Sequence, residues 1–340
     1  MSEKVANIRE LNINGKWALS FLVVTFGRLV GDALAVDVPI FHCKLVNSES
    51  NEANRSKGFD LQAKKPVFLV HGLFAASLML PLKRRIQEAF PGTVVELPAD
   101  FSGFRSMTAL DKQVKGSFGE KFRNFSDKHP GGITVIGYSQ GAILARAFIQ
   151  SYPQHNVDNF IAVAGPLDGQ YGFVGFNEFM YEFLELGSFL GYTSNVAYDL
   201  FAQNYLSLAN MWHDPFQQER HLKYNTFLST YNNLVSHERS DDYKNAFVKL
   251  KKLITITGPN DLVLYPWKSG EFAYYSVKAT SHDRKIDNFT EREIYIKDTF
   301  GLKTLHELGR IINIVHPGLS HLNWVTDDYV IDNFILPNLA

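Results

Sequence analysis

The sequence has 340 residues, of which 45% are hydrophobic and 20% charged, and its formal net charge is −1. This composition is typical of a globular chain with a large core and excludes intrinsic disorder along most of its length. A pI near 6.8 leaves no basic surface field that could hold a phosphate backbone. We therefore expect no nucleic-acid partner and favour a small or lipidic ligand.

The N-terminal segment resembles a secretory signal. Lys16 precedes an apolar run over 17–26, and Ala33-Leu34-Ala35 has the small-x-small pattern of a signal-peptidase site. We predict a signal peptide over residues 1–35. The alternative is a first amphipathic helix or buried strand, because Arg28 and Asp32 interrupt the approach to the cleavage site. The run is shorter than the ~20 apolar residues that cross a bilayer, so we expect no integral membrane span.

The cysteine content argues against secretion. Cys43 is the single cysteine, so no intrachain disulfide can form, which is typical of a reducing compartment. Three N-x-[ST] sequons, at Asn54, Asn124 and Asn288, permit glycosylation but are no more than chance provides. Secretion and a cytoplasmic location both stay open on these residues.

Residues 36–65 are predicted to be an N-terminal segment and a polar linker, because 47–65 is polar and charged throughout. Short apolar runs then recur with helical segments such as 82–90 and 144–152 between them. This alternation predicts an α/β domain over 66–340 with a mainly parallel sheet covered on both faces. The predicted strands lie within "PVFLVHG" (66–72), "GTVVELP" (92–98), "GITVIGY" (132–138), "NFIAVAG" (159–165), "KLITITG" (252–258) and "IINIVHP" (311–317).

One long segment interrupts this alternation. Residues at about 170–250 are dense in aromatic side chains and show no strand pattern. We predict a helical insertion between two strands of the sheet.

A serine lies at a sharp strand-to-helix junction. In "ITVIGYSQGAILARAF", Gly137, Ser139 and Gly141 form G-x-S-x-G between a predicted strand and a predicted helix. This context is typical of the nucleophile elbow of α/β-hydrolases, where glycines keep side chains away from a strained serine. The motif predicts Ser139 as a nucleophile. The alternative is an ordinary turn or N-cap serine.

A serine nucleophile needs a base and an acid, which in this fold follow it in the chain on loops after later strands. Asp261 follows "KLITITG", and His321 follows "IINIV". Each has a rival that also lies near a strand end. Asp168 could supply the acid from an earlier strand, and His316 lies closer to its own strand than His321 does.

The oxyanion of an acyl-transfer reaction needs backbone donors. We expect the amide of Gln140, which follows the nucleophile, and that of Leu73 or Phe74 in the loop after the first strand. His71 precedes the serine in the chain and is interpreted as a buried residue that holds this loop. His213 and the surface-like His221 and His237 have no metal-ligand companions at useful spacing, so no metal is predicted.

From about residue 66 to the C-terminus the chain resembles the palmitoyl-protein thioesterase family, and most closely its second lysosomal type. The resemblance is carried by segments in order, among them "VFLVHGLF", "GYSQGA", "MWHDP", "GPNDLVLYPW" and "GLSHLNW". It implies hydrolysis of long-chain acyl thioesters with Ser139, His321 and Asp261 as the triad, Leu73 and Gln140 as oxyanion donors, and no cofactor. It also implies a lysosomal location. The animal lysosomal members carry several disulfides that this chain cannot form, so a cytoplasmic location stays the alternative.

A fatty acyl substrate needs an apolar groove. We expect the aromatic insertion to supply it, although the same side chains could be the core of a helical cap. A carboxylesterase or lipase using the same triad is the alternative activity, and a non-enzymatic lipid-binding protein is the second alternative. The candidate groove residues are Tyr171, Phe173, Phe176, Phe179 and Phe183.

Overall fold

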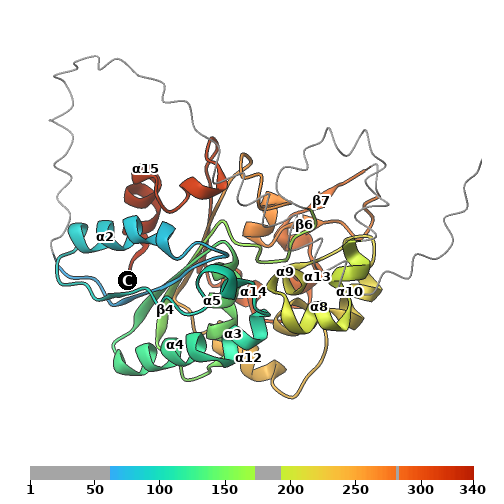
Figure 1. Ribbon diagram of the computed structural model, residues 1–340, viewed down its shortest axis with the longest axis horizontal. Coiled ribbons are helices and arrows are strands. Elements are labelled where there is room, and N and C mark those ends of the chain that lie inside the picture. Colours follow the sequence, from blue (N-terminus) through green and yellow to red (C-terminus); the bar gives the residue numbers. More distant parts are fainter. Residues whose placement is uncertain (1–61, 173–192, 281–282) are drawn as a thin grey trace, which may run out of the picture. The chain divides into compact units, whose positions relative to one another are not determined.

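A parallel sheet of six strands lies at the centre of the computed structural model, which describes residues 62–172, 193–280 and 283–340 (Figure 1). Its spatial order is β2-β1-β3-β4-β5-β8, and every neighbouring pair is parallel. The predicted runs all form strands, so the α/β-hydrolase fold class is confirmed. The strands are β1 (Val67–Val70), β2 (Val95–Glu96), β3 (Ile133–Tyr138), β4 (Val157–Val163), β5 (Lys252–Thr257) and β8 (Ile311–Val315).

The chain divides into two units, Met1–Arg55 and Ser56–Ala340, and all described residues belong to the second. The predicted signal peptide over 1–35, most of the 36–65 segment, Cys43 and Asn54 lie outside the described residues.

Helices and short helical turns connect these strands. The α-helices are α2 (Leu80–Ala89), α3 (Leu110–Lys115), α4 (Ser117–Lys128), α5 (Gln140–Ser151), α8 (Leu200–Tyr205), α9 (Ser207–Met211), α10 (Gln218–Tyr224), α11 (Leu228–Tyr231), α12 (Ser240–Phe247), α13 (Glu293–Ile296), α14 (Leu302–Glu307) and α15 (Asp328–Val330). The short turns are η2 (Ser77–Met79), η3 (Gly103–Met107), η4 (Trp267–Glu271), η5 (Phe289–Glu291), η6 (His321–Asn323), η7 (Ile331–Ile335) and η8 (Leu336–Asn338). A separate antiparallel pair joins β6 (Tyr274–Tyr275) to β7 (Ile286–Asp287).

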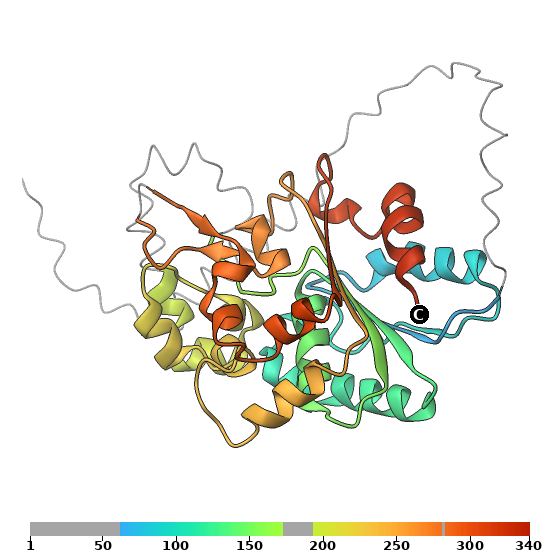
Figure 2. The same cartoon turned by 180° about the vertical axis from the view of Figure 1, so that it is seen from behind.

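Both faces of the sheet are covered over β1, β3, β4 and β5, whereas the edge strand β8 is partly exposed. Side chains alternate along a strand, so Phe68 and Val70 pack into one buried cluster while Val67 and Leu69 pack into the other. Figures 1 and 2 show α4, α5 and α12 on the first face and α2 with α15 on the second. This two-sided burial explains why the strands are apolar without alternation.

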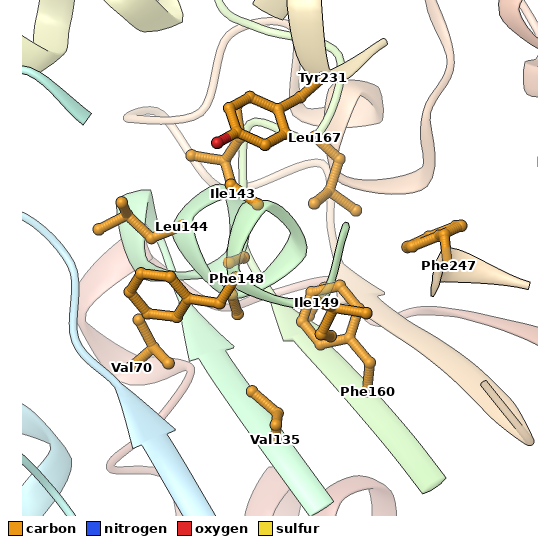
Figure 3. Close-up of a cluster of buried hydrophobic side chains, with 14 of the residues drawn as sticks. Val70, Val135, Ile143, Leu144, Phe148, Ile149, Phe160, Leu167, Tyr231 and Phe247 are labelled. Carbon is orange, nitrogen blue, oxygen red and sulfur yellow. The ribbon is translucent and has the colours of Figure 1, made fainter. Parts of the chain in front are cut away.

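The α5 helix fills the centre of the first face. Figure 3 shows the ring of Phe148 next to Val70 of β1 and the side chain of Ile149 next to Phe160 of β4. The helix is buried along all but its last residue, so it holds the elbow at its N-terminus on a rigid base. A helix that the sequence analysis did not predict, α4, packs beside it with buried phenylalanines three and four residues apart, at positions 118, 122 and 125.

The described part of the chain between β4 and β5 is helical. Helices α8, α9, α10 and α11 lie there, and no named strand occurs over 193–247. Figures 1 and 2 show α8 and α10 beside the β6–β7 pair at one end of the sheet. In contrast, α12 contacts α5 and contributes Tyr243 and Phe247 to the central core.

Candidate active site

Ser139 lies on a strained turn at the end of β3, where α5 begins. Its backbone has φ 55° and ψ −129°, a left-handed conformation that is costly for a residue with a side chain. The turn also requires close approach by its neighbours. A Cβ on Gly141 would lie 2.0 Å from the carbonyl oxygen of Val70, and one on Gly137 would lie 2.5 Å from Cα of Ala142. The predicted reason for both glycines is therefore confirmed.

Three side chains from three strand ends meet at this turn. The Oγ of Ser139 lies 2.9 Å from Nε2 of His321, and Nδ1 of His321 lies 2.7 Å from Oδ2 of Asp261. Asp261 follows β5 and His321 begins η6 after β8. Because all these strands are parallel, their carboxyl ends share one edge of the sheet, and residues 182 positions apart in the chain become neighbours.

Besides Nδ1 of His321, three donors hold the carboxylate of Asp261. Its Oδ1 accepts hydrogen bonds of 3.0 Å from the amides of Val263 and Leu264, and its Oδ2 accepts from Nε1 of Trp324 at 3.0 Å. An acceptor at this position requires a proton on Nδ1 of His321, which leaves Nε2 free to accept the hydroxyl proton of Ser139. Trp324 was not predicted from the sequence, although its position one helical turn after His321 was an available signal.

Asp168 and His316, the alternatives for the acid and the base, lie among other side chains. Asp168 is fully buried and accepts from Asn232 at 3.0 Å and from Arg292 at 3.0 and 3.2 Å. The ring of His316 packs against Tyr329 and Phe334, with both centroids 5.4 Å away. Both rivals therefore have structural contacts of their own.

Two backbone amides are available beside Ser139. Gln140 is the first residue of α5, so its amide has no partner within the helix. Among the described residues, neither this amide nor that of Leu73 donates to a protein acceptor. The other candidate, the amide of Phe74, donates to Oγ of Ser106 at 3.0 Å. The helix dipole of α5 adds positive potential at the same place.

His71 lies beneath this loop. Its ring is 1% exposed and stacks on Phe118, with the ring centroids 5.3 Å apart. Nδ1 and Nε2 lie 3.0 and 2.9 Å from the backbone carbonyls of Gly72 and Asp100. The interpretation of His71 as a buried residue that holds the loop is therefore confirmed.

Comparison with known proteins identifies the family. A family model described as palmitoyl protein thioesterase matches residues 66–321. The chain belongs to this family. It is therefore a thioester hydrolase, which confirms the predicted enzyme class.

Curated relatives agree with this family. The thioesterase is 38% identical over 285 residues to "Lysosomal thioesterase PPT2 homolog" of Drosophila melanogaster, covering 82% of this chain and 92% of the relative. It is 33% identical over 277 residues to "Lysosomal thioesterase PPT2" of Homo sapiens, covering 81% and 88%. A solved structure, carboxylesterase CesB (YbfK) from Bacillus subtilis, is similar at 12% identity with a TM-score of 0.38, covering 81% of this chain and 83% of that one.

The predicted groove residues fall largely outside the described part of the thioesterase. Phe173, Phe176, Phe179 and Phe183 all lie outside the described residues. Tyr171 is 4% exposed and belongs to a separate cluster of buried aromatic side chains, where its ring lies 5.2 Å from that of Trp212.

Two histidines of the thioesterase form a buried stack. His221, interpreted from the sequence as surface-like, is fully buried, and its ring lies 3.9 Å from that of His213. The interpretation of His221 as surface-like was wrong because α10 places its ring against that of His213, whose ring in turn stacks on Tyr274 of β6 at 4.3 Å. Burial lowers the pKa of both imidazoles, so the stack is neutral.

Over residues 62–172, 193–280 and 283–340, no group of three or more His, Cys, Asp or Glu side chains is arranged to hold a metal ion. No helix within these same ranges has the length and apolar character that a bilayer crossing needs.

Proposed function

We propose that this thioesterase hydrolyses long-chain fatty acyl thioesters with Ser139 as nucleophile, His321 as general base and Asp261 as the residue that orients the base. The observation that supports the proposal is the continuous line of hydrogen bonds, 2.9 Å from Ser139 to His321 and 2.7 Å from His321 to Asp261. These distances lie in the range required for proton transfer.

In the first step, Oγ of Ser139 attacks the thioester carbonyl carbon while Nε2 of His321 takes the hydroxyl proton. The carbonyl oxygen becomes an oxyanion, which the amides of Leu73 and Gln140 stabilise by about 3 kcal/mol per donor. The carbon–sulfur bond then breaks. The sulfur takes the proton from His321 and leaves as a thiol, and the acyl group stays on Ser139 as an ester.

In the second step, water attacks the acyl ester and gives its proton to Nε2 of His321. The same two amides stabilise the second oxyanion. The bond to Oγ breaks, Ser139 regains a proton from His321, and the fatty acid is released. Asp261 stays ionised throughout and stabilises the imidazolium that forms in each step.

The acyl chain needs an apolar site, because its burial contributes about 0.8 kcal/mol per methylene. We assign this site to the aromatic segment that carries Phe173, Phe176, Phe179 and Phe183. Truncation of Phe176 or Phe179 to alanine should weaken the preference for long over short acyl chains. An unchanged chain-length preference in both variants would contradict the assignment.

The central test compares palmitoyl-CoA with a p-nitrophenyl ester for the wild-type chain, Ser139→Ala and a control, Ser151→Ala, at the other end of α5. We expect Ser139→Ala to lose both activities and Ser151→Ala to keep them. The ratio of the two substrates in the wild type measures the preference for thioesters. Labelling by a serine-directed fluorophosphonate that persisted in Ser139→Ala would exclude Ser139 as the nucleophile.

We also propose a lysosomal location, reached through cleavage of the N-terminal segment near Val36. The proposal is supported by the names of the relatives and by the exposure of Asn124 on α4 and Asn288 before η5, as glycan acceptors require. N-terminal sequencing and glycosidase treatment of the protein from its own cells test it. A mature protein that begins at Met1 and carries no glycan would favour the cytoplasm.

A further inference from the structure

The two proposed oxyanion amides lie on different segments of the chain. Leu73 follows β1, whereas Gln140 begins α5. Both N–H groups must point at one oxygen atom about 3 Å from each, so their spacing must be held closely. The strand and helix position each segment separately, and a contact that bridges the two loops would determine the spacing between them.

One buried residue makes such a contact with both segments. Ser106 in η3 is fully buried. Its Oγ accepts a 3.0 Å hydrogen bond from the amide of Phe74, the residue after Leu73. Its backbone carbonyl accepts a 2.8 Å hydrogen bond from the side-chain Nε2 of Gln140. Ser106 therefore joins the loop after β1 to the start of α5.

The contact with Phe74 supports a strained backbone. Phe74 has φ 54°, in the left-handed region that costs a residue with a side chain of order 1 kcal/mol. A hydrogen bond from its amide to Ser106 stabilises this conformation. The peptide bond that precedes Phe74 is thereby fixed, and with it the orientation of the adjoining Leu73.

The serine is itself held from several sides. Its hydroxyl donates to the carbonyl of Gly103 at 2.5 Å, so the lone pairs of Oγ are directed at Phe74. Its carbonyl also accepts from Nε2 of Gln113 at 3.1 Å and from Oγ of Ser207 at 3.3 Å. These contacts leave Ser106 little freedom to move. An alanine at this position would keep the carbonyl contacts and remove only those of the hydroxyl.

We propose that Ser106 is a positioning residue that sets the spacing between the oxyanion amides of Leu73 and Gln140. The inference rests on the proposed function, since it concerns the same oxyanion. Ser106 acts through Phe74 and Gln140 and does not touch the substrate. Loss of its hydroxyl leaves the Phe74 amide without its acceptor, which allows the loop to shift and weakens the donor that Leu73 provides.

The test is steady-state kinetics of Ser106→Ala with palmitoyl-CoA. We expect kcat to fall about tenfold or more with KM little changed, because the oxyanion donors act mainly in the transition state. Ser106→Thr keeps the hydroxyl and should restore most of kcat. Ser106→Cys, with a weaker acceptor of similar size, should lie between them and provides a second reading if the alanine variant folds poorly.

A matched control separates positioning from general destabilisation. Ser269 is also fully buried, and its hydroxyl donates to the carbonyl of Gly169 at 2.6 Å and accepts from the amide of Asp168 at 3.1 Å. Ser269→Ala should lower the melting temperature as Ser106→Ala does while leaving kcat near the wild-type value. Binding of a trifluoromethyl ketone analogue of palmitate, which forms an oxyanion, should weaken only in Ser106→Ala.

Wild-type kcat in Ser106→Ala, or an equal loss of kcat in Ser269→Ala, would overturn the inference. These outcomes are distinct from failure of the proposed function, which would appear as full activity in Ser139→Ala. An inactive Ser139→Ala together with a fully active Ser106→Ala would leave the triad standing and remove the positioning role.

Discussion

The phenol of Tyr138 donates a 2.7 Å hydrogen bond to the backbone carbonyl of His321. Tyr138 is the last residue of β3, directly before Ser139, and its ring centroid lies 5.4 Å from that of His321. Burial raises the pKa of this phenol, so it stays protonated and remains a donor. The bond ties the loop that carries the imidazole to the strand that carries the serine.

Tyr138→Phe should therefore lower kcat. Loss of the bond leaves the His321 carbonyl without this donor, so the imidazole is held less firmly beside Ser139. A hydrogen bond contributes about 1 kcal/mol, and a loss of that size in transition-state stabilisation slows the reaction roughly fivefold. Tyr274→Phe is the matched control, because the buried Tyr274 phenol donates to the carbonyl of His213 at 2.6 Å. We expect similar losses of melting temperature in both variants and a slower kcat only in Tyr138→Phe; equal kcat values would contradict the prediction.

Gly72→Ala should abolish most activity. A Cβ at this position would lie 2.8 Å from Cβ of Ser139 and 3.3 Å from the amide nitrogen of Gln140, inside the proposed oxyanion site. We expect kcat/KM to fall by about a hundredfold or more, the scale of losing one oxyanion donor. Gly131→Ala, where a Cβ meets nothing within 4 Å, is the control and should remain active. Full activity of Gly72→Ala would show that the loop does not approach Ser139 so closely.

Acidic pH should weaken the fold through His155. Its Nδ1 accepts the amide of Val157 at 3.0 Å and its Nε2 donates to the carbonyl of Ala246 at 2.9 Å, so only the neutral ring fits. Burial lowers its pKa from 6.5 to about 4. Between pH 6.5 and about 4, the unfolded chain binds a proton at His155 that the folded protein does not. The contribution of neutral His155 to the free energy of unfolding is therefore complete above pH 6.5 and falls by roughly 3 kcal/mol as pH drops to about 4.

Urea unfolding of the thioesterase at pH 7.5 and pH 4.5 measures this loss. His155→Asn keeps an acceptor for the Val157 amide but is neutral at every pH, so its stability should depend less on pH than that of the wild type. The exposed His306 provides the control, since His306→Gln should keep the wild-type pH dependence. An unaltered slope in His155→Asn would assign the acid sensitivity to other groups, such as His213 and His221.

Arg146→Met should stabilise the protein. The guanidinium is fully buried between aromatic rings, 5.1 Å from Phe300 and 5.7 Å from Phe272. Its Nε, Nη1 and Nη2 atoms have no hydrogen-bond partner among the described residues. Burial lowers its pKa to about 10, so it still carries a charge at pH 7. Replacing a buried charge by an apolar side chain of similar volume stabilises by about 1 kcal/mol or more.

Thermal unfolding of Arg146→Met and Arg146→Ala tests this expectation. The methionine variant should melt above the wild type, whereas the alanine variant should melt below it because it leaves a cavity. If both variants lost stability to the same extent, the charge itself would be contributing to the fold.

Much of the architecture could be predicted from local patterns. Strands such as β3 and β5 were recognised because burial on both faces requires unbroken apolar runs, and these runs are visible within six residues. The elbow was recognised because the spacing of Gly137 and Gly141 around Ser139 is also local. The β6–β7 pair was missed, since two residues per strand carry no periodicity.

Local sequence could not distinguish the two candidate acids. Asp168 and Asp261 both follow strands, and the sequence offers no measure of what each carboxylate contacts. In the structure, Asp168 accepts hydrogen bonds from Arg292, which is 124 residues away in the chain. Asp261 instead hydrogen-bonds to His321 and Trp324, which are about 60 residues away. Hydrogen bonds between distant segments separate the two carboxylates.

Sequence alone determined the fold class, the serine turn and the chain order of the three candidate residues, because apolar runs and glycine spacing act over a few neighbouring residues. Tertiary structure decided which imidazole contacts Ser139 and which carboxylate contacts that imidazole, that His221 is buried, and that Ser106 bridges Phe74 and Gln140. A serine in a short helical turn carries no distinguishing local pattern. Its importance arises from two hydrogen bonds to residues 32 and 34 positions away, which exist only once the chain has folded.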